Sequence, residues 1–404
     1  MQMKLENRII LLLLAIGLIA GCGSDDPSPD TTVKAVTKTN PMKLYMHYMP
    51  WFQSKSFSGY WGSHWRMTNK NPDIVDDTGK RQIASHYYPL IGPYDSQDPD
   101  VIEYHLLLMK YAGIDGVLID WYGSHAIYDY KVNLQGSNAL IDKTDDIGLQ
   151  FAVVYEDYTA QSVEDQTSKT GMEAGQADMA YLQENYFSKP EYILINKVPL
   201  LMTFGPRYFK QASQWTQLFE SLKTKPKLLP LWWHAGYTGN NTGGEYAWVD
   251  FKEGFADLTS FYNRTGVDVM MGSAFPRFHD FYEEGGTGTS YGYVGYNNGE
   301  TLKTTLNKAK DKNLQYLQLV TWNDFGEGTV IEPTLEDGFD CLKMIQQFAG
   351  VSYGQDELEL IYTYYQKKVK YKGDATAMET LKKVFDHLAA LEPDQAKDIL
   401  SQLP

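Results

Sequence analysis

Short apolar runs alternate with longer amphipathic segments from residue 43 onward. The apolar runs predict eight strands, at 43–48, 114–120, 150–155, 199–204, 228–233, 246–250, 268–274 and 316–322. Between them, the spacing of the apolar positions predicts helices over 98–112, 174–187, 208–223, 300–313 and 335–349. Strands that alternate with helices are typical of a parallel sheet built from βα units. The pattern therefore predicts an α/β fold of the (β/α)8 TIM-barrel type, regular or irregular.

The pattern changes at both ends of this region. Residues 355–404 are rich in Leu, Lys, Glu and Asp at helical spacing and contain no strand candidate. They predict a C-terminal helical extension, 353–404, whose two or three helices pack on the flank of a barrel domain at 41–352. Residues 23–40 are rich in Ser, Thr, Asp and Pro and have no apolar period, so they predict a disordered tether.

The N-terminus has the features of an export signal. Lys4 and Arg8 precede an apolar run, 9–20, that is too short to span a bilayer as a helix. The run closes on Leu-Ile-Ala-Gly-Cys, which resembles the bacterial lipobox and implies that residues 1–22 are a lipoprotein signal peptide with Cys22 acylated. The acidic stretch that follows resembles the export tags of surface lipoproteins. We therefore expect a lipid anchor in the outer membrane or at the cell surface of a Gram-negative bacterium. A plain secretory signal is the alternative, and it also predicts export.

Charge and composition indicate which classes of binding partner suit this protein. The formal net charge of −15 repels polyanions, which argues against nucleic acid and favours a neutral oligo- or polysaccharide. The chain has 30 Tyr and 9 Trp, and flat rings with a polar edge suit the faces of sugars, although a tyrosine-rich core would explain many of them. Cys341 is the only cysteine besides Cys22, and the eight histidines form no HExxH motif. We expect no disulfide, no metal and no cofactor.

The candidate chemistry lies after the last predicted strand. In a (β/α)8 barrel the active site is at the C-terminal ends of the strands. Asp324 and Glu327 are three residues apart there, in a turn broken by Gly326 and Gly328. A glycosidase needs one protonated and one ionised carboxyl group, and a crowded, partly apolar site can raise one pKa above the other. We therefore predict that Asp324 and Glu327 are the catalytic pair; a solvated acidic turn is the alternative.

Other strand ends carry further acids and rings. Asp120 ends the second predicted strand and Glu156 follows the third, and each could bind hydroxyls, assist catalysis or hold a loop; the same applies to Asp157. The Gly-rich segment 285–299 predicts a mobile loop over the cleft. The residues expected to contact sugar are Tyr48, Trp51, Trp61, His64, Trp65, Trp121, Tyr122, Tyr155, Trp233, His234, Trp322 and Asn323.

Several motifs resemble glycoside hydrolase families 71 and 99. These are YMHYMPWF, WGSHW, YYPLIGPYDSQDPDVIEYHLLLMKYAGIDGVLIDWYG and WNDFGEGTVIEP, which cover most of residues 43–333 in the right order. Family 99 contains retaining, endo-acting α-mannosidases and α-mannanases. The resemblance implies that Asp324 assists the 2-hydroxyl of the sugar and that Glu327 acts as acid and base. Asp324 stands where family 99 usually has Glu, and Asn-Asp-Phe-Gly-Glu follows family 71, whose members cleave α-1,3-glucan.

Two classes of function are compatible with these features. The first is an exported, retaining glycoside hydrolase that cleaves α-linked glycans of the α-mannan or α-glucan type, with an exo-acting or xylose-directed hydrolase as a variant on the same barrel. The second is a surface glycan-binding lipoprotein that has lost turnover, because a fold alone does not establish activity. The presence of both Asp324 and Glu327 favours the hydrolase.

Overall fold

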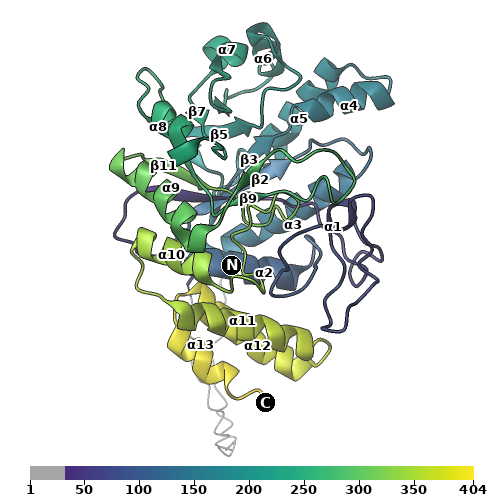
Figure 1. Ribbon diagram of the computed structural model, residues 1–404, viewed down its shortest axis with the longest axis vertical. Coiled ribbons are helices and arrows are strands. Elements are labelled where there is room, and N and C mark those ends of the chain that lie inside the picture. The colour runs from purple at the N-terminus through teal and green to yellow at the C-terminus, as the bar shows by residue number, and fades with distance from the viewer. Residues whose placement is uncertain (1–31) are drawn as a thin grey trace, which may run out of the picture. The chain divides into compact units, whose positions relative to one another are not determined.

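The computed structural model describes residues 32–404. The expected signal peptide, Cys22 and the first part of the expected tether lie outside the described residues. Eight parallel strands surround the centre of the domain (Figure 1). They are β1 (Lys43–Tyr48), β2 (Gly116–Trp121), β3 (Gln150–Tyr155), β5 (Val198–Thr203), β6 (Lys227–Pro230), β7 (Glu245–Tyr246), β8 (Met270–Ala274) and β11 (Tyr316–Leu319).

The strands form a closed ring. From β1 the sheet runs through β2, β3 and β5 to β6 in one direction, and through β11 and β8 to β7 in the other. The two ends meet through isolated parallel bridges, which pair Leu228 with Thr242 and Leu231 with Tyr246. The predicted (β/α)8 fold is therefore confirmed, and each of the eight predicted strands overlaps an observed one.

Helices follow the strands and cover the outside of the ring (Figure 1). They are α2 (Pro99–Tyr111), α3 (Tyr130–Ile147), α4 (Tyr158–Gln166), α5 (Gly171–Asn185), α6 (Ala212–Leu218), α7 (Ala235–Thr238), α8 (Ala256–Tyr262), α9 (Glu300–Asp311) and α10 (Asp340–Ala349). Smaller elements lie in the connections: α1 (Ser63–Arg66), β4 (Leu194–Ile195), η1 (Gly239–Asn241), η2 (Glu253–Phe255), β9 (Phe278–His279), β10 (Tyr293–Val294) and η3 (Asn297–Gly299). One continuous apolar core fills the space between strands and helices.

Helices α2 and α3 show what makes a helix predictable from the sequence: a clear start signal and a regular apolar period. Asp98 caps α2 by accepting the backbone N–H of Asp100, and Pro99 occupies the first turn. The 18-residue helix α3 was not predicted, because its buried face includes Asn133, Gly136 and other small or polar residues, which blurs the apolar period. Gly136 is required there, since a Cβ at this position would lie 2.4 Å from the carbonyl oxygen of Pro50.

Three helices complete the C-terminal end: α11 (Gln355–Lys370), α12 (Ala375–Ala389) and α13 (Pro393–Leu400). They lie together at the C-terminal end of the chain in Figure 1, with α11 against α2. Lys368 on α11 is almost buried and pairs with Asp100 at 2.6 Å and with Glu103, both on α2. Two carboxylates of α2 satisfy this buried charge from α11, so the ion pairs fix how α11 sits on the barrel.

Residues 32–40 differ from the expected tether. The backbone N–H of Thr39 donates to Gly350 O at 3.1 Å and that of Asn40 to Ala349 O at 3.0 Å. Lys38 pairs with Asp115 at the start of β2. The prediction of disorder is therefore wrong for this part of 23–40, because polar residues here find hydrogen-bond partners on the domain. Within residues 32–404, no helix has both the length and the apolar character that a membrane crossing requires.

Candidate active site

A cavity of 160 Å³ lies at the C-terminal ends of the strands. Its lining comes from most of the ring and consists of His47, Met49, Trp51, Asp120, Tyr122, Glu156, Phe204, Arg207, Trp248, Tyr282, Tyr291, Asp324 and Glu327. A second cavity of 360 Å³ shares Trp51, Tyr122, Tyr282 and Asp324 with the first. It adds Ser63, His64, Met67, Thr68, Thr287 and Gly326. The two cavities therefore adjoin, with Asp324 between them.

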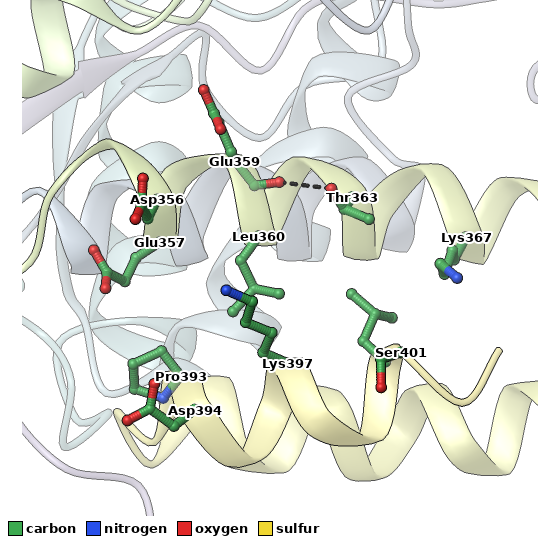
Figure 2. Close-up of a pocket in the computed structure, with 11 residues that line it drawn as sticks. Asp356, Glu357, Glu359, Leu360, Thr363, Lys367, Pro393, Asp394, Lys397 and Ser401 are labelled. Atoms are coloured by element: carbon green, nitrogen blue, oxygen red, sulfur yellow. Dashed lines mark hydrogen bonds between the residues drawn. The ribbon is translucent and has the colours of Figure 1, made fainter. Parts of the chain in front are cut away.

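A larger cavity of 600 Å³ lies far from these strand ends, between α11 and α13 (Figure 2). The carboxylates of Asp356, Glu359 and Asp394 on its rim belong to exposed residues. In Figure 2 the hydroxyl of Thr363 donates to the carbonyl oxygen of Glu359, a bond within one helix. Exposed carboxylates such as these suit a solvated surface. The barrel cavity is the one with buried, interacting acids.

A tight turn places Asp324 and Glu327. The backbone N–H of Asp324 donates to Thr321 Oγ1, and the backbone N–H of Glu327 donates to Asp324 Oδ1, both at 2.8 Å. Gly328 closes the turn with φ +69° and donates its N–H to Asp324 O at 2.8 Å. A side chain at Gly328 would be strained by this φ and would meet His279 O at 2.5 Å. Glycine is thus needed for both acids to reach the cavity.

The surroundings of Asp324 and Glu327 raise the pKa values of the two carboxyl groups to different extents. Burial raises the pKa of Asp324 to about 6, while the hydrogen bond from the Glu327 N–H and the nearby His64 oppose the rise. Burial also raises the pKa of Glu327 well above its usual range, and the negative charges of Asp324 and Asp280 add to this effect. Near neutral pH, Asp324 is therefore mostly ionised and Glu327 protonated. This is the combination that glycoside hydrolysis uses.

Two further acids and one arginine face the same space. Burial raises the pKa of Glu156 to about 7 against the opposing charge of Arg207. Burial and the charge of Glu156 raise the pKa of Asp120 well above normal, and Asp120 Oδ2 has no hydrogen-bond partner among residues 32–404. Asp157 does not line the cavity; it accepts the backbone N–H groups of Arg207, Tyr208 and Phe209, each at 2.8 Å. It holds the loop that carries Arg207.

Asn323 lies beneath the turn and fixes it to the end of β1. Its Oδ1 accepts the backbone N–H of Met49 at 2.8 Å, and its Nδ2 donates to Met49 O and to the Tyr94 hydroxyl, both at 3.0 Å. Asn323 is fully buried and does not line either cavity. The expectation that it contacts sugar is not met, because its amide is fully used in these bonds.

The network continues away from the cavity. The Tyr94 hydroxyl donates to Glu332 Oε2 at 2.7 Å, and His105 Nε2 lies 3.2 Å from Glu332 Oε1. The Tyr48 hydroxyl lies 3.0 Å from His105 Nδ1. Asn323 and Glu332 stand at the two ends of the segment that contains Asp324 and Glu327, and both are therefore tied to one buried set of polar side chains.

Strand alternation explains three other residues that do not reach the cavity. Successive side chains on a strand point to opposite faces. The hydroxyl of Tyr48 meets His105 on α2, the ring of Trp121 packs on Tyr181 of α5, and the hydroxyl of Tyr155 donates to Asp178 of α5 at 2.9 Å. All three side chains face the surrounding helices, and their sequence neighbours line the cavity: His47, Asp120 and Glu156.

Other predicted sugar contacts are also held elsewhere. The indole N–H of Trp65 donates to Tyr94 O at 2.8 Å and that of Trp61 to Asp73 Oδ1 at 3.0 Å, and both rings are buried. The ring of Trp322 is fully buried. Outside the cavity lining, Trp233 is half exposed beneath the guanidinium of Arg264, and His234 Nδ1 lies 3.1 Å from Gly205 O.

Of the twelve residues expected to contact sugar, the structure brings Trp51, His64 and Tyr122 to the cavities. Four of the five candidate acids, all except Asp157, also line them. The rings of Trp51 and His64 are parallel, with centroids 4.2 Å apart. The predictions of catalytic and binding roles for these residues stay predictions. Within residues 32–404, no group of three His, Cys, Asp or Glu side chains is arranged to hold a metal ion.

Sequence reasoning missed several lining residues. His47 precedes the predicted Tyr48, and Trp248 lies inside the predicted strand 246–250, so the period of two along a strand was the available signal. Arg207 follows β5, the fourth of the predicted strands, in a segment that no apolar pattern marks as part of the site. Tyr282 and Tyr291 come from the loop between β9 and β10; Tyr291 falls within the Gly-rich segment expected over the cleft.

Comparison with known proteins agrees with this geometry. Residues 40–225 match the sequence model of Glycosyl hydrolase family 99, a range that ends before Asp324 and Glu327. The glycoprotein endo-alpha-1,2-mannosidase of Mus musculus is 24% identical over 72% of this chain and 68% of its own length. The corresponding Rattus norvegicus protein is 23% identical over 78% and 73%.

A solved structure shares the fold. The GH99 endo-alpha-mannosidase from Bacteroides thetaiotaomicron superimposes with a TM-score of 0.59 at 17% identity, covering 79% of this chain and 98% of that protein. The sequence relatives, the shared barrel and the paired acids at its strand ends lead to one conclusion. The chain is a glycoside hydrolase that is similar to members of family 99.

Proposed function

We propose that this protein cleaves internal α-mannosidic linkages of neutral glycans with retention of configuration, using Asp324 and Glu327. The observation that carries the proposal is the turn in which the Glu327 N–H donates to Asp324 Oδ1 beside a cavity lined with aromatic rings. The names of the sequence relatives, endo-alpha-1,2-mannosidases, support mannose as the sugar and endo action as the mode.

The two acidities assign the roles. Glu327, protonated at neutral pH, donates its proton to the glycosidic oxygen as the bond to the anomeric carbon breaks. Ionised Asp324 accepts the proton of the sugar 2-hydroxyl, whose oxygen attacks the anomeric carbon to form a 1,2-anhydro sugar. The Glu327 carboxylate then takes a proton from water, the water oxygen opens the anhydro ring, and Asp324 returns its proton to the 2-oxygen. Both residues end in their starting states.

The pair can be tested by isosteric replacement. Glu327→Gln removes the proton donor and keeps the shape, so turnover of α-mannan should fall on the order of a hundredfold or more while ligand binding persists. Asp324→Asn should act mainly on kcat, because the carboxylate is needed in the transition state. Near wild-type hydrolysis by both variants would contradict the assignment and make Glu156 and Asp120 the next residues to replace.

The substrate can be tested with protein lacking residues 1–22. We expect release of oligosaccharides from α-mannan and no release from α-1,3-glucan or arabinoxylan. A mannan whose 2-hydroxyls are methylated should resist cleavage if the 2-oxygen attacks. Release of single sugars would contradict endo action, and hydrolysis of α-1,3-glucan would redirect the proposal to the family 71 specificity that Asn-Asp-Phe-Gly-Glu resembles.

The location is a separate proposal that rests on the sequence around Cys22. We propose that acylation of Cys22 anchors the exported protein in a membrane. Cys22→Ser should move the protein from the membrane fraction to the periplasm or the medium, as measured by fractionation and immunoblotting. If the variant stays with the membrane, acylation of Cys22 is not the anchor.

A further inference from the structure

The segment around β9 holds the catalytic turn from one side. The backbone N–H of His279 donates to Glu327 O at 2.9 Å, and that of Phe281 donates to Gly326 O at 2.8 Å. Asp280 lies between these two bonds. Its position along the chain is therefore fixed directly beside the turn that carries Glu327.

Asp280 is a buried carboxylate that uses one of its two oxygens. Oδ2 accepts the backbone N–H of Tyr291 at 2.7 Å and the hydroxyl of Ser290 at 3.0 Å. Oδ1 is buried and has no hydrogen-bond partner among residues 32–404, and the residue is 3% exposed. Such an unpartnered charged oxygen is costly unless the site uses it.

Glu327 has a matching unpartnered oxygen. Its Oε2 is also buried without a hydrogen-bond partner in the described part of the chain. The charge of Asp280 opposes ionisation of Glu327, next in size after burial and the charge of Asp324. The mechanism proposed above has no step for Asp280, so the presence of this second charge beside the acid is unexplained by it.

Asp280 also fastens the loop whose residues Tyr282 and Tyr291 line the cavity. The rings of Tyr282 and Tyr291 line the cavity and meet edge to face, with centroids 5.3 Å apart. The middle of the loop is held separately, where Gly285 O accepts the N–H and the hydroxyl of Thr68, at 3.1 and 2.8 Å. The bonds from Asp280 to residues 290 and 291 secure the remaining, C-terminal side of the loop.

We propose that Asp280 is a positioning residue for the hydrolysis, which fastens the tyrosine loop, residues 280–292, over the cavity through Oδ2 and holds a carboxylate beside the acid Glu327. The inference rests on the proposed role of Glu327. By fastening the loop, Asp280 determines how the substrate is held. Its negative charge determines up to which pH Glu327 keeps its proton.

Other titratable and charged groups also surround Glu327, but none takes the place of the negative charge of Asp280. The acidic or phenolic groups that face Glu327 are Asp324 on the same turn, Tyr282 on the loop, Asp120 on β2 and Glu156 after β3. Arg207, after β5, also faces it, and its positive charge acts in the opposite direction. On the far side of Asp280, the ring of His86 stacks on that of His279 with centroids 3.7 Å apart. His86 contacts the carbonyl oxygen of Asp280 at 3.2 Å and Glu284 at 3.7 Å.

Two substitutions separate the two tasks. Asp280→Asn keeps an oxygen for Ser290 and Tyr291 and removes the charge, so KM should stay within about twofold while the alkaline limb of kcat/KM moves down by about half a pH unit or more. Asp280→Ala removes both, so the same limb should move, KM should rise roughly fivefold or more, and amide exchange of residues 282–291 should accelerate. Glu283 is an exposed acid on the same loop, so Glu283→Gln is the control. It should leave KM, the alkaline limb of kcat/KM and the amide exchange of the loop unchanged.

The measurements distinguish this inference from the proposed function. Amide exchange and titration of the Glu327 carboxyl by NMR need no turnover and are read on the unliganded protein. An unmoved Glu327 titration in both Asp280 variants, or unchanged exchange of the loop in Asp280→Ala, would overturn the positioning role. Full activity of Glu327→Gln with these shifts present would instead overturn the proposed function alone.

Discussion

Asp324 Oδ1 lies 2.8 Å from the backbone nitrogen of Glu327, so the two proposed catalytic residues are joined by a hydrogen bond through the turn itself. The bond favours the ionised form of Asp324 and ties the position of one acid to that of the other. Replacement of either residue therefore alters a shared unit, and their effects on rate should not be additive.

This relationship predicts a bell-shaped pH profile. Burial raises the pKa of Asp324 to about 6, and Asp324 must be ionised, so kcat/KM should rise with pH through about 6. Burial and the charge of Asp324 hold the pKa of Glu327 higher, and Glu327 must be protonated, so the rate should fall again on the alkaline side. Steady-state rates from pH 4 to 10 check both limbs. A rate that declines steadily above pH 4 would contradict the assigned protonation states.

The structure separates the tryptophans into two classes, because Trp51 lines both cavities while Trp65 and Trp121 are buried. Trp51→Ala should weaken oligosaccharide binding by roughly 1 kcal/mol or more and leave Tm nearly unchanged. Trp65→Ala and Trp121→Ala should instead lower the free energy of unfolding by about 3 to 5 kcal/mol. Calorimetric titration and thermal unfolding measure the two effects. A strong Tm loss in Trp51→Ala with unaltered binding would place this ring in the core.

The buried network predicts that Tyr94 acts on turnover from outside the cavity. Tyr94→Phe removes the hydroxyl between Asn323 and Glu332, which leaves Glu332 with fewer partners and should cost about 1 to 3 kcal/mol of stability. Because Asn323 adjoins Asp324, kcat should fall about tenfold while KM changes little. Tyr316→Phe, on β11 at the opposite end of the barrel, is the control. Equal kinetics for both variants would show that the network does not position the turn.

The buried acids predict how stability depends on pH. The pKa of Glu156 is about 7 in the folded protein against an ordinary value of 4.5, so ionisation is easier in the unfolded chain. The stability from this carboxyl is fully present below pH 4.5 and is lost as pH rises to about 7. The Tm of Glu156→Gln relative to wild type should therefore increase across this window, by about 2 to 5 °C, and then level off.

Glu184→Gln on α5 is the matched control for this prediction, because Glu184 is exposed. Its Tm should track that of the wild type at every pH. A Glu156→Gln variant that follows the same course as the control would show that Glu156 ionises as easily in the folded protein as in the unfolded chain.

The elements that can be predicted from the sequence are those whose apolar residues follow a simple pattern. Buried parallel strands are continuous apolar runs, so all eight were found, whereas α3 was missed because Asn133 and Gly136 stand on its buried face. Asp120, Glu156, Asp324 and Glu327 were found because a barrel fixes where strand ends meet.

The rest of the site depends on pairings that no local pattern records. Asp280 and Tyr291 come together through an irregular loop, and Glu332 meets His105 across 227 residues of chain. Trp121 and Asp120 are adjacent in sequence and lie on opposite faces of β2, so a run of aromatic and acidic residues does not by itself indicate which side chain reaches the cavity.

The closure between β6 and β7 has a dynamic consequence. Other neighbours in the ring share continuous ladders, while these two strands meet through the bridges at Leu228 and Leu231. Local opening should begin where the fewest hydrogen bonds must break together. The backbone amides of Trp232 and Gly243, which donate across this seam, should exchange with solvent earlier than those of β1 and β2. Transient opening of the barrel would then be localised to this seam between β6 and β7.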